Sequence, residues 1–206
     1  MNADSDNDLS ANLAFVKALV SDGPRMQASA GLIFLVAGLA YGIDCLIYVW
    51  QIRGNVALSP LVWLLLAVAP PTVFFVALFY VLWRDRKLAN HGVATRAVNA
   101  AYGSAGLANL FVALSFGYVA MLEKSMTIWL LYPIAMCAFQ GSVWYVAFMV
   151  RRKLWLLGAS AGWFVTTLLL AWLIRDTGSY LLVLGIALVG LMGGSGWYMM
   201  RQADKG

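Results

Sequence analysis

Six apolar stretches, each about as long as a bilayer core is thick, constrain this chain more than any other feature. A helix needs roughly 20 apolar residues to cross that core, where only helices and closed barrels satisfy their backbone hydrogen bonds. With 63% apolar and 11% charged residues, the 206-residue chain cannot hide this surface in water. We therefore predict an all-α integral membrane protein with six transmembrane helices. The spans lie at about 27–50, 60–83, 98–121, 127–150, 154–174 and 180–200.

The segment before the first span, residues 1–25, has a different pattern. It opens with three aspartates and lacks the basic start of a cleaved signal peptide. Apolar residues then recur at helical spacing from 9 to 20, and Gly23-Pro24 ends the pattern. We predict a polar N-terminus with a short amphipathic helix at the cytoplasmic surface, followed by a transmembrane domain at 26–206.

The basic residues predict the orientation of the chain. Eleven of its 14 lysines and arginines flank the spans on one side, and three, Arg53, Lys124 and Arg175, lie on the other. Because cytoplasmic loops carry the excess of lysine and arginine, both termini are predicted to be cytoplasmic, in a bacterial-type inner membrane. The pI of about 9.4 has the same origin, so we expect the lipid bilayer, and no nucleic acid, as a partner.

A short motif, Ser-Ala-Gly, opens the first, third and fifth spans. Moving the first span by 75 positions onto the third also aligns three leucines and a second glycine. This similarity predicts three sequential hairpins related by a parallel pseudo-threefold repeat, with antiparallel neighbours. Small residues let helices approach closely in lipid, so we assign the motif to helix packing. The packing residues are Ser29, Gly31, Ser104, Gly106, Ser160 and Gly162.

Asp44 is the acidic residue that lies well inside a span, where a carboxylate is costly and needs a reason. Tyr41 and Tyr48, three and four residues away, share its helical face. The repeat alignment carries Asp44 onto Arg175, which predicts an ion pair, or a hydrogen-bonded cluster with the two tyrosines, that closes the outer end of the bundle. Two alternatives stay open: a carboxylate near a loop, and a site that couples to a proton or a cation.

Other polar or helix-breaking residues at depth are few. Asn109 and Gln140 are expected to bond neighbouring helices or, with Asp44, to line a narrow polar path. Pro70 and Pro71 stand in the middle of the second span, where proline removes a helix hydrogen bond, and they predict a kink or hinge.

The sequence offers no set of catalytic or metal-binding groups. The single histidine, His91, falls in a connection, and Cys45 and Cys137 lie far apart in separate spans. We therefore expect no enzyme, no metal and no cofactor. The first hypothesis is a non-catalytic accessory or regulatory subunit that binds a partner protein or a lipid. The alternative is a small oligomeric transporter or channel for a solute or ion, with Asp44 and a polar path.

Overall fold

The described part of the chain consists of helices and short connections. The computed structural model describes residues 24–86 and 93–204, and no strand occurs within them. Six helical runs are long and apolar enough to cross a membrane, as in a multi-pass membrane protein. The amphipathic helix predicted at 9–20 and His91 lie outside the described residues. The elements are α2 (Pro24–Gly54), α3 (Pro60–Asp85), α4 (Val93–Leu122), α5 (Met126–Arg151), α6 (Leu154–Trp172), α7 (Thr177–Ala187), the π-helix η1 (Leu188–Gly193) and α8 (Gly194–Ala203).

Local sequence explains where helices begin and end. α3 begins after Ser59, whose hydroxyl accepts a hydrogen bond from the Val62 backbone N–H at 3.4 Å, and Pro60 occupies the first turn. These are favoured choices, because Ser satisfies a free helix N–H and Pro has none to satisfy. α5 ends at Arg151, and the capping residue Arg152 adopts a left-handed conformation with φ of 54° and donates its N–H to the Phe148 carbonyl.

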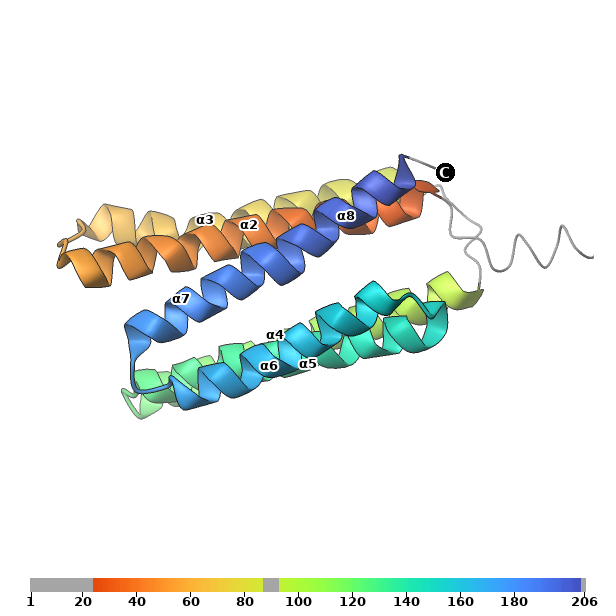
Figure 1. The fold of residues 1–206 in the computed structure, drawn as a ribbon. Coiled ribbons are helices and arrows are strands. Elements are labelled where there is room, and N and C mark those ends of the chain that lie inside the picture. The colour runs from red at the N-terminus through yellow and green to blue at the C-terminus, as the bar shows by residue number, and fades with distance from the viewer. Residues whose placement is uncertain (1–23, 87–92, 205–206) are drawn as a thin grey trace, which may run out of the picture.

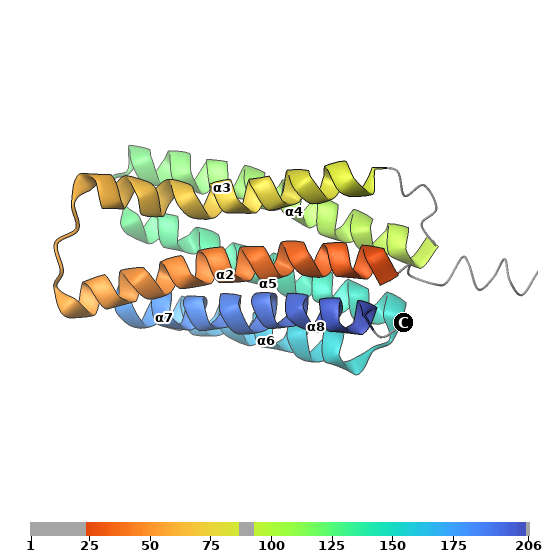
Figure 2. The ribbon, with the colours of Figure 1, turned by 90° about the horizontal axis from the view of Figure 1, so that it is seen from above.

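The helices form two layers of three. The first layer contains α3, α2 and the run α7–η1–α8, with α2 in the middle, and the second contains α4, α5 and α6, with α5 in the middle (Figure 1). Figure 2 shows α3 and α4 along one edge, and the last span and α6 along the other. The start of α2 and the end of α8 lie at the same end of the bundle, hereafter the terminal end. There the Gln27 side-chain amide donates to the Gln202 side-chain oxygen at 3.0 Å.

The third predicted hairpin is open, unlike the other two. α2 packs on α3, and α4 packs on α5, as expected of hairpins. α6, however, packs mainly on α5, whereas α7, η1 and α8 pack on α2. The last span therefore leaves the second layer at the α6–α7 turn and joins the first layer (Figure 1). The described arrangement is two layers, and it does not show the predicted threefold repeat of hairpins.

Glycines form the seam between α2 and the last span. A methyl group on Gly31 would lie 2.6 Å from the Gly196 carbonyl oxygen, and one on Gly196 would lie 2.5 Å from that of Gly31. At Gly38 it would collide with the backbone of Gly193. At Gly42 it would lie 2.6 Å from a Val189 methyl. Helices associate in lipid through such close backbone approach, and these glycines let the backbone of α2 meet that of the last span.

A six-residue π-helix, η1, interrupts the last span where it meets this seam. A methyl group on Gly38 would lie 2.6 Å from the Leu188 carbonyl oxygen, at the start of η1. π-helical turns have wider hydrogen-bonded rings and are rare insertions within α-helices. This π-helix was not expected from the sequence, because glycines there fit α-helical packing equally well.

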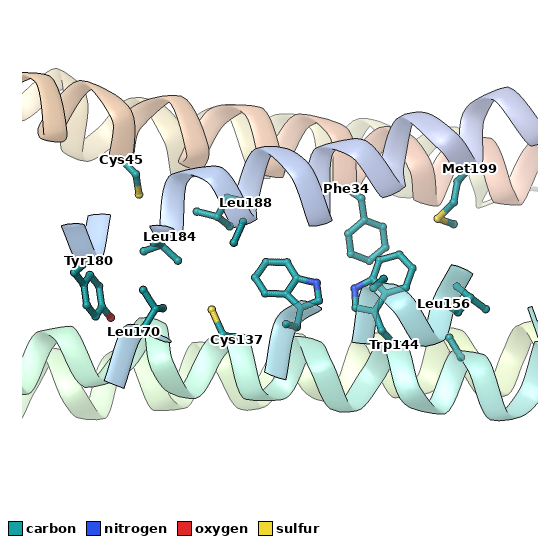
Figure 3. Packing of buried hydrophobic residues seen from close by; sticks show 14 of the residues in the cluster. Phe34, Cys45, Cys137, Trp144, Leu156, Leu170, Tyr180, Leu184, Leu188 and Met199 are labelled. Atoms are coloured by element: carbon teal, nitrogen blue, oxygen red, sulfur yellow. The ribbon is translucent and has the colours of Figure 1, made fainter. Parts of the chain in front are cut away.

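Large side chains, many of them aromatic, fill the space between the layers. Phe34 and Met199 reach down from the first layer, and Trp144 and Leu156 reach up from the second (Figure 3). The Phe34 ring lies 5.2 Å from that of Trp144, centroid to centroid. Trp144 and Trp163 are fully buried. The inter-layer contact is thus made by side chains, whereas the seam in the first layer is made by backbone.

The two helices at one edge of the bundle are largely uncovered. The most apolar stretch of α4 contains no buried residue, and that of α3 contains very few. Their exposed side chains are mostly leucine, valine and aromatic residues, which suits a surface in contact with lipid tails.

Candidate functional site between the two layers

Asp44 lies on α2 and is half-buried. Its Oδ1 atom is buried and makes no hydrogen bond to any described residue. Tyr41, Tyr48 and Cys45 are within electrostatic range of the carboxyl group, as expected from their positions on adjacent turns of one helix. The prediction that both tyrosines share the face of Asp44 is consistent with this geometry.

The predicted ion pair between Asp44 and Arg175 is wrong. No ion pair joins them among the described residues, and Arg175 is exposed. The physical reason is that α6 ends at Trp172, so Arg175 belongs to the turn that leads to α7. The repeat alignment compares how deep two residues lie in the membrane, but it does not indicate toward which neighbour each helix face is turned. Asp44 therefore has no compensating cation in the described part of the chain.

The turn that holds Arg175 has its own polar contact. Asp176 is the N-cap of α7, and its side chain accepts a hydrogen bond from the Ser179 backbone N–H at 3.3 Å. Hydrogen bonds from Ser179, with a smaller contribution from Arg53, hold the pKa of the Asp176 carboxyl below its ordinary value. This acidic residue serves the helix terminus and is not part of the inter-layer site.

Tyr132 and Asn109 bring the second layer to Asp44. The Asn109 side-chain amide on α4 donates to the Tyr132 hydroxyl on α5 at 3.1 Å. Tyr132 is in turn within electrostatic range of Tyr41 on α2, so the group reaches across both layers. Asn109 Oδ1 is buried without a hydrogen bond from the described residues. The set Tyr41, Asp44, Asn109 and Tyr132 thus draws on three helices, linked by the Asn109–Tyr132 hydrogen bond and otherwise by electrostatic proximity, and we name it the Asp44 cluster.

The neighbours of the Asp44 cluster toward α7 are Cys45, Cys137 and Tyr180. Cys45 and Cys137 are buried free thiols on opposite layers, and their sulfur atoms point into the space between them (Figure 3). Tyr180 is fully buried and donates its hydroxyl to the Leu130 carbonyl at 2.6 Å, so it ties α7 to α5. This side of the Asp44 cluster is therefore closed by packed side chains.

Gln140 continues the polar groups along α5 toward the terminal end. It is half-buried, and its Oε1 atom makes no hydrogen bond within the described ranges. One turn further along α5 stands Trp144, whose ring packs on Tyr102 and Trp155 at 5.8 and 5.7 Å between centroids. Whether Asn109 and Gln140 form one polar path with Asp44, as the sequence suggested, stays a prediction.

The proline pair does not break its helix. α3 runs continuously from Pro60 to Asp85 through Pro70 and Pro71, and Pro70 is buried. The next residue, Thr72, donates its hydroxyl to the Val68 carbonyl at 2.7 Å. Such a bond gives the helix additional local support beside the prolines. Their role as a hinge stays a prediction.

The three Ser-Ala-Gly copies have three different environments. Ser29 accepts a hydrogen bond from Arg84 at 2.6 Å, and Ser160 donates to the Gly141 carbonyl at 2.8 Å. Ser104 is exposed and bonds its own helix at the Ala101 carbonyl. The glycines differ in the same way, since Gly31 meets Gly196, Gly162 faces Leu191, and Gly106 has open space beside it. The second copy therefore makes none of the close contacts of the first and third.

Tyr132 is the member of the Asp44 cluster that sequence reasoning missed. It precedes Pro133 and resembles any other aromatic residue of the fourth span. Only the arrangement of α4 and α5 shows that its hydroxyl meets Asn109. The one available signal was a phenolic hydroxyl at the depth of another polar residue, and this signal is weak.

No group of three or more His, Cys, Asp or Glu side chains suited to a metal occurs in the part of the chain that the structure describes. Comparison of the chain with protein-family models, with curated proteins and with solved structures finds no match. The function is therefore inferred from the Asp44 cluster itself.

Proposed function

We propose that this protein is a small, non-catalytic membrane transport protein. It binds a cation at the Asp44 cluster and moves it across the membrane through the space between the two layers of helices. The observation that carries this proposal is a carboxylate within a span that lacks a cationic partner among the described residues. An ionisable group at such a depth costs several kcal/mol unless it has a functional or structural partner. The structural partner expected from the sequence, Arg175, is not in place.

The chemistry of the Asp44 cluster suits a cation. It presents one carboxylate, two phenolic oxygens from Tyr41 and Tyr132, and the Asn109 amide oxygen, whose Oδ1 is buried and unbonded within the described residues. Carboxylate, hydroxyl and amide oxygens are ligands for hard cations. Aromatic rings beside them also attract cations. A monovalent inorganic cation or a protonated amine is therefore the preferred cargo.

The layered arrangement supports movement around such a site. Helices pack extensively within each layer, and the contacts between layers are concentrated on α6 with α7 and η1. Two rigid bodies that rock about a connected edge can open a site alternately to either side. The Asp44 cluster draws its residues from both bodies, so a relative motion would change its geometry.

The test is cation uptake into liposomes that contain the purified full chain. We expect uptake of labelled Na⁺, K⁺ or methylammonium to depend on Asp44. The Asp44→Asn variant should lose it, and Asp44→Glu should retain part of it. Asp85→Asn is the matched control, since Asp85 pairs with Arg84 at the helix end. Equal uptake by wild type and Asp44→Asn for all three cations would contradict the proposal.

The accessory-subunit hypothesis keeps one specific observation in its favour. α4 exposes a face that carries Gly103 and Gly106, both with open space beside them, in a stretch without buried residues. Small residues on an uncovered helix permit close approach of another helix. Native mass spectrometry after gentle extraction distinguishes the two proposals. A second polypeptide at fixed stoichiometry would favour the accessory role, and a homo-oligomer or a monomer that retains a cation would favour transport.

The orientation is a proposal as well: both termini face the cytoplasm of a bacterial-type inner membrane. The supporting observations are the bias of the basic residues and the terminal end itself. There the Arg201 guanidinium lies 4.0 Å from the centre of the Trp197 ring, a pairing suited to the membrane–water interface. Labelling of single cysteines placed at Asn55 and at Gln202 by a membrane-impermeant reagent in intact cells tests it. Labelling should occur at position 55 alone.

A further inference from the structure

The two layers are joined along one edge of the bundle and not along the other. Among the described helices, α3 packs extensively only on α2, and α4 only on α5, although both lie along the same edge (Figure 2). At the opposite edge α6 packs on α7 and η1. The largest fully buried side chains come from α5, α6 and α7, whereas α3 buries only Pro70 and Val81. Within the described residues, helix packing therefore does not close the α3/α4 edge between the layers.

The Asp44 cluster is covered unequally on its two sides. Every member of the cluster is half-buried. Toward α7, the neighbouring Cys45, Cys137 and Tyr180 are buried. On the other side the cluster meets the α3/α4 edge, because Asn109 itself belongs to α4. The exposed part of the cluster is therefore turned toward the edge that helix packing leaves open.

Aromatic rings of α3 extend the cluster toward this edge. The Tyr41 ring lies 6.3 Å from the Phe74 ring of α3, centroid to centroid. The Tyr48 ring likewise lies 5.3 Å from the Trp63 ring of α3. Phe74 is half-buried and Trp63 is exposed. The tyrosines on either side of Asp44 thus contact rings of α3, one of which reaches the lipid-facing surface.

The second layer adds aromatic rings from the other side. Trp129 stacks on Tyr132 with 5.3 Å between ring centroids, and the Trp129 side chain is exposed. A methyl group on Gly117 of α4 would lie 3.3 Å from the Trp129 ring, so Trp129 stands where α5 meets α4. Aromatic rings therefore border the cluster in both layers at the α3/α4 edge.

This combination favours one class of cation. Asp44 supplies a full negative charge that no cationic side chain among the described residues balances, and aromatic faces attract positive charge. A small inorganic ion needs a shell of oxygen ligands, whereas an organic cation with an apolar body gains free energy from every apolar contact. Such a molecule concentrates in the bilayer, because its apolar body is removed from water there. It therefore reaches the α3/α4 edge from the lipid side.

We propose that the cation bound at the Asp44 cluster is an amphipathic organic cation, an amine or quaternary ammonium with an apolar body, which enters from the bilayer between α3 and α4. This inference rests on the proposed transport function and specifies the class of cargo and its route. The charged group of the cargo meets the Asp44 carboxylate, and its apolar body meets the rings of α2, α3 and α5. No covalent bond is made or broken.

A different explanation is that the rings at this edge only pack against lipid tails. The two explanations differ in what a Phe→Leu change does. Leucine keeps an apolar side chain but has no aromatic face. It therefore leaves contact with lipid largely in place, yet weakens the binding of a cation.

The binding experiment uses the purified full chain in detergent, with tritiated tetraphenylphosphonium as the probe. We expect Asp44→Asn to abolish specific binding, and Phe74→Leu to weaken it about fivefold, as loss of one cation–ring contact predicts. Phe111→Leu is the matched control, because Phe111 is 61% exposed and lies two positions from Asn109, on the far side of α4. Thermal unfolding of every variant identifies any that fails to fold, and Trp63→Leu is a second ring variant if Phe74→Leu is unstable.

A series of ammonium ions tests the recognition of an apolar body. Each ion is used to displace the bound tetraphenylphosphonium. We expect tetrapropylammonium to displace it at a concentration at least about tenfold lower than tetramethylammonium, because each additional buried methylene group favours binding. Methylammonium, whose uptake tests the proposed function, is the small end of the same series and should be the weakest competitor.

Photolabelling tests the route. The full chain in liposomes is irradiated with (4-azidobenzyl)trimethylammonium, and peptide mass spectrometry then locates the labelled residues. We expect labels on α3 and α4, and fewer labels in the Asp44→Asn variant.

The outcomes separate this inference from the proposed function. Equal probe binding by wild type and Asp44→Asn, together with Asp44-dependent uptake of Na⁺ or K⁺, overturns the class of cargo and leaves the proposed function intact. Unchanged binding in folded Phe74→Leu and Trp63→Leu, or equal displacement by the small and large ammonium ions, overturns the aromatic site alone. Labels confined to α6 and the last span overturn the route. No Asp44-dependent binding or uptake of any cation overturns both proposals.

Discussion

The seam within the first layer and the contact between the layers are built in opposite ways. In the seam, Gly31 and Gly196 bring two helix backbones together, with no room for even a methyl group. Between the layers, rings such as Phe34 and Trp144 fill the space, and polar atoms remain without partners in the described residues. The seam tolerates no added atom, whereas side chains between the layers can change rotamer. The difference separates the rigid part of the molecule from the part suited to a site.

The largest effect is expected from adding side-chain atoms to the seam. Gly38→Val would drive its Cβ atom into the backbone of Gly193 and to 2.6 Å from the Leu188 carbonyl oxygen. We expect a loss of at least about 3 kcal/mol in stability, or failure to fold. Gly158→Val is the control, because nothing lies within 4 Å of a methyl group placed there. Thermal unfolding in detergent measures both, and equal midpoints would refute the backbone seam.

A smaller effect separates the second copy of Ser-Ala-Gly from the third. Ser160→Ala removes the hydrogen bond to the Gly141 carbonyl, which joins α6 to α5 inside the second layer, and should cost about 1 kcal/mol. Ser104→Ala should cost less than about 0.5 kcal/mol, because Ser104 is exposed and bonds only its own helix among the described contacts. If the two variants lost equal stability, the copies would be structurally equivalent and the two-layer arrangement would be in doubt.

A smaller change still is expected when the charge between the layers is removed. Asp44→Asn should leave stability within about 0.5 kcal/mol of wild type or raise it slightly, because the carboxylate has no compensating cation among the described residues. Arg175→Gln should be similarly neutral, and the double variant should be additive. Chemical unfolding of the four proteins provides the measurement. Strong non-additivity would show that the two charges interact after all.

The smallest effect concerns the turn between the layers and depends on pH. The Asp176 carboxyl has its pKa lowered below 3.8 in the folded chain, mainly by hydrogen bonds from Ser179. Its stabilising contribution is therefore complete above the ordinary value and is lost as the pH falls through the lowered folded value. Wild type should exceed Asp176→Ala in thermal stability at neutral pH, and the difference should shrink on acidification. A stability difference that grew as the pH fell would contradict a lowered pKa of Asp176 in the folded chain.

The number and extent of the spans could be predicted from sequence, because long apolar stretches have no alternative to helix in lipid. The predicted span at 60–83, for example, corresponds to the helix Pro60–Asp85. The partners of each helix could not be predicted. In lipid the outer face is as apolar as the inner one, so periodicity does not indicate which side of α4 or α7 is buried.

Part of the candidate site could likewise be predicted from the sequence, and part could not. Asp44, Tyr41 and Asn109 were found because polar groups are conspicuous in an apolar span. Their partner was assigned incorrectly, since an alignment of repeats compares depth and ignores the rotation of each helix. Tyr132 could be assigned to the Asp44 cluster only from the fold, because the sequence does not show which aromatic residue meets Asn109. The two-layer arrangement is a tertiary property that no single span encodes.

The open third hairpin has a consequence for how the protein is made. α2 is the first described span to emerge from the ribosome, yet its glycine face packs on the last one. During synthesis this face has no permanent partner until five further spans have been inserted. The first layer is therefore completed only after the second has been threaded into the bilayer. A nascent chain interrupted before Thr177 would leave the glycine face of α2 open to lipid and to quality-control proteases.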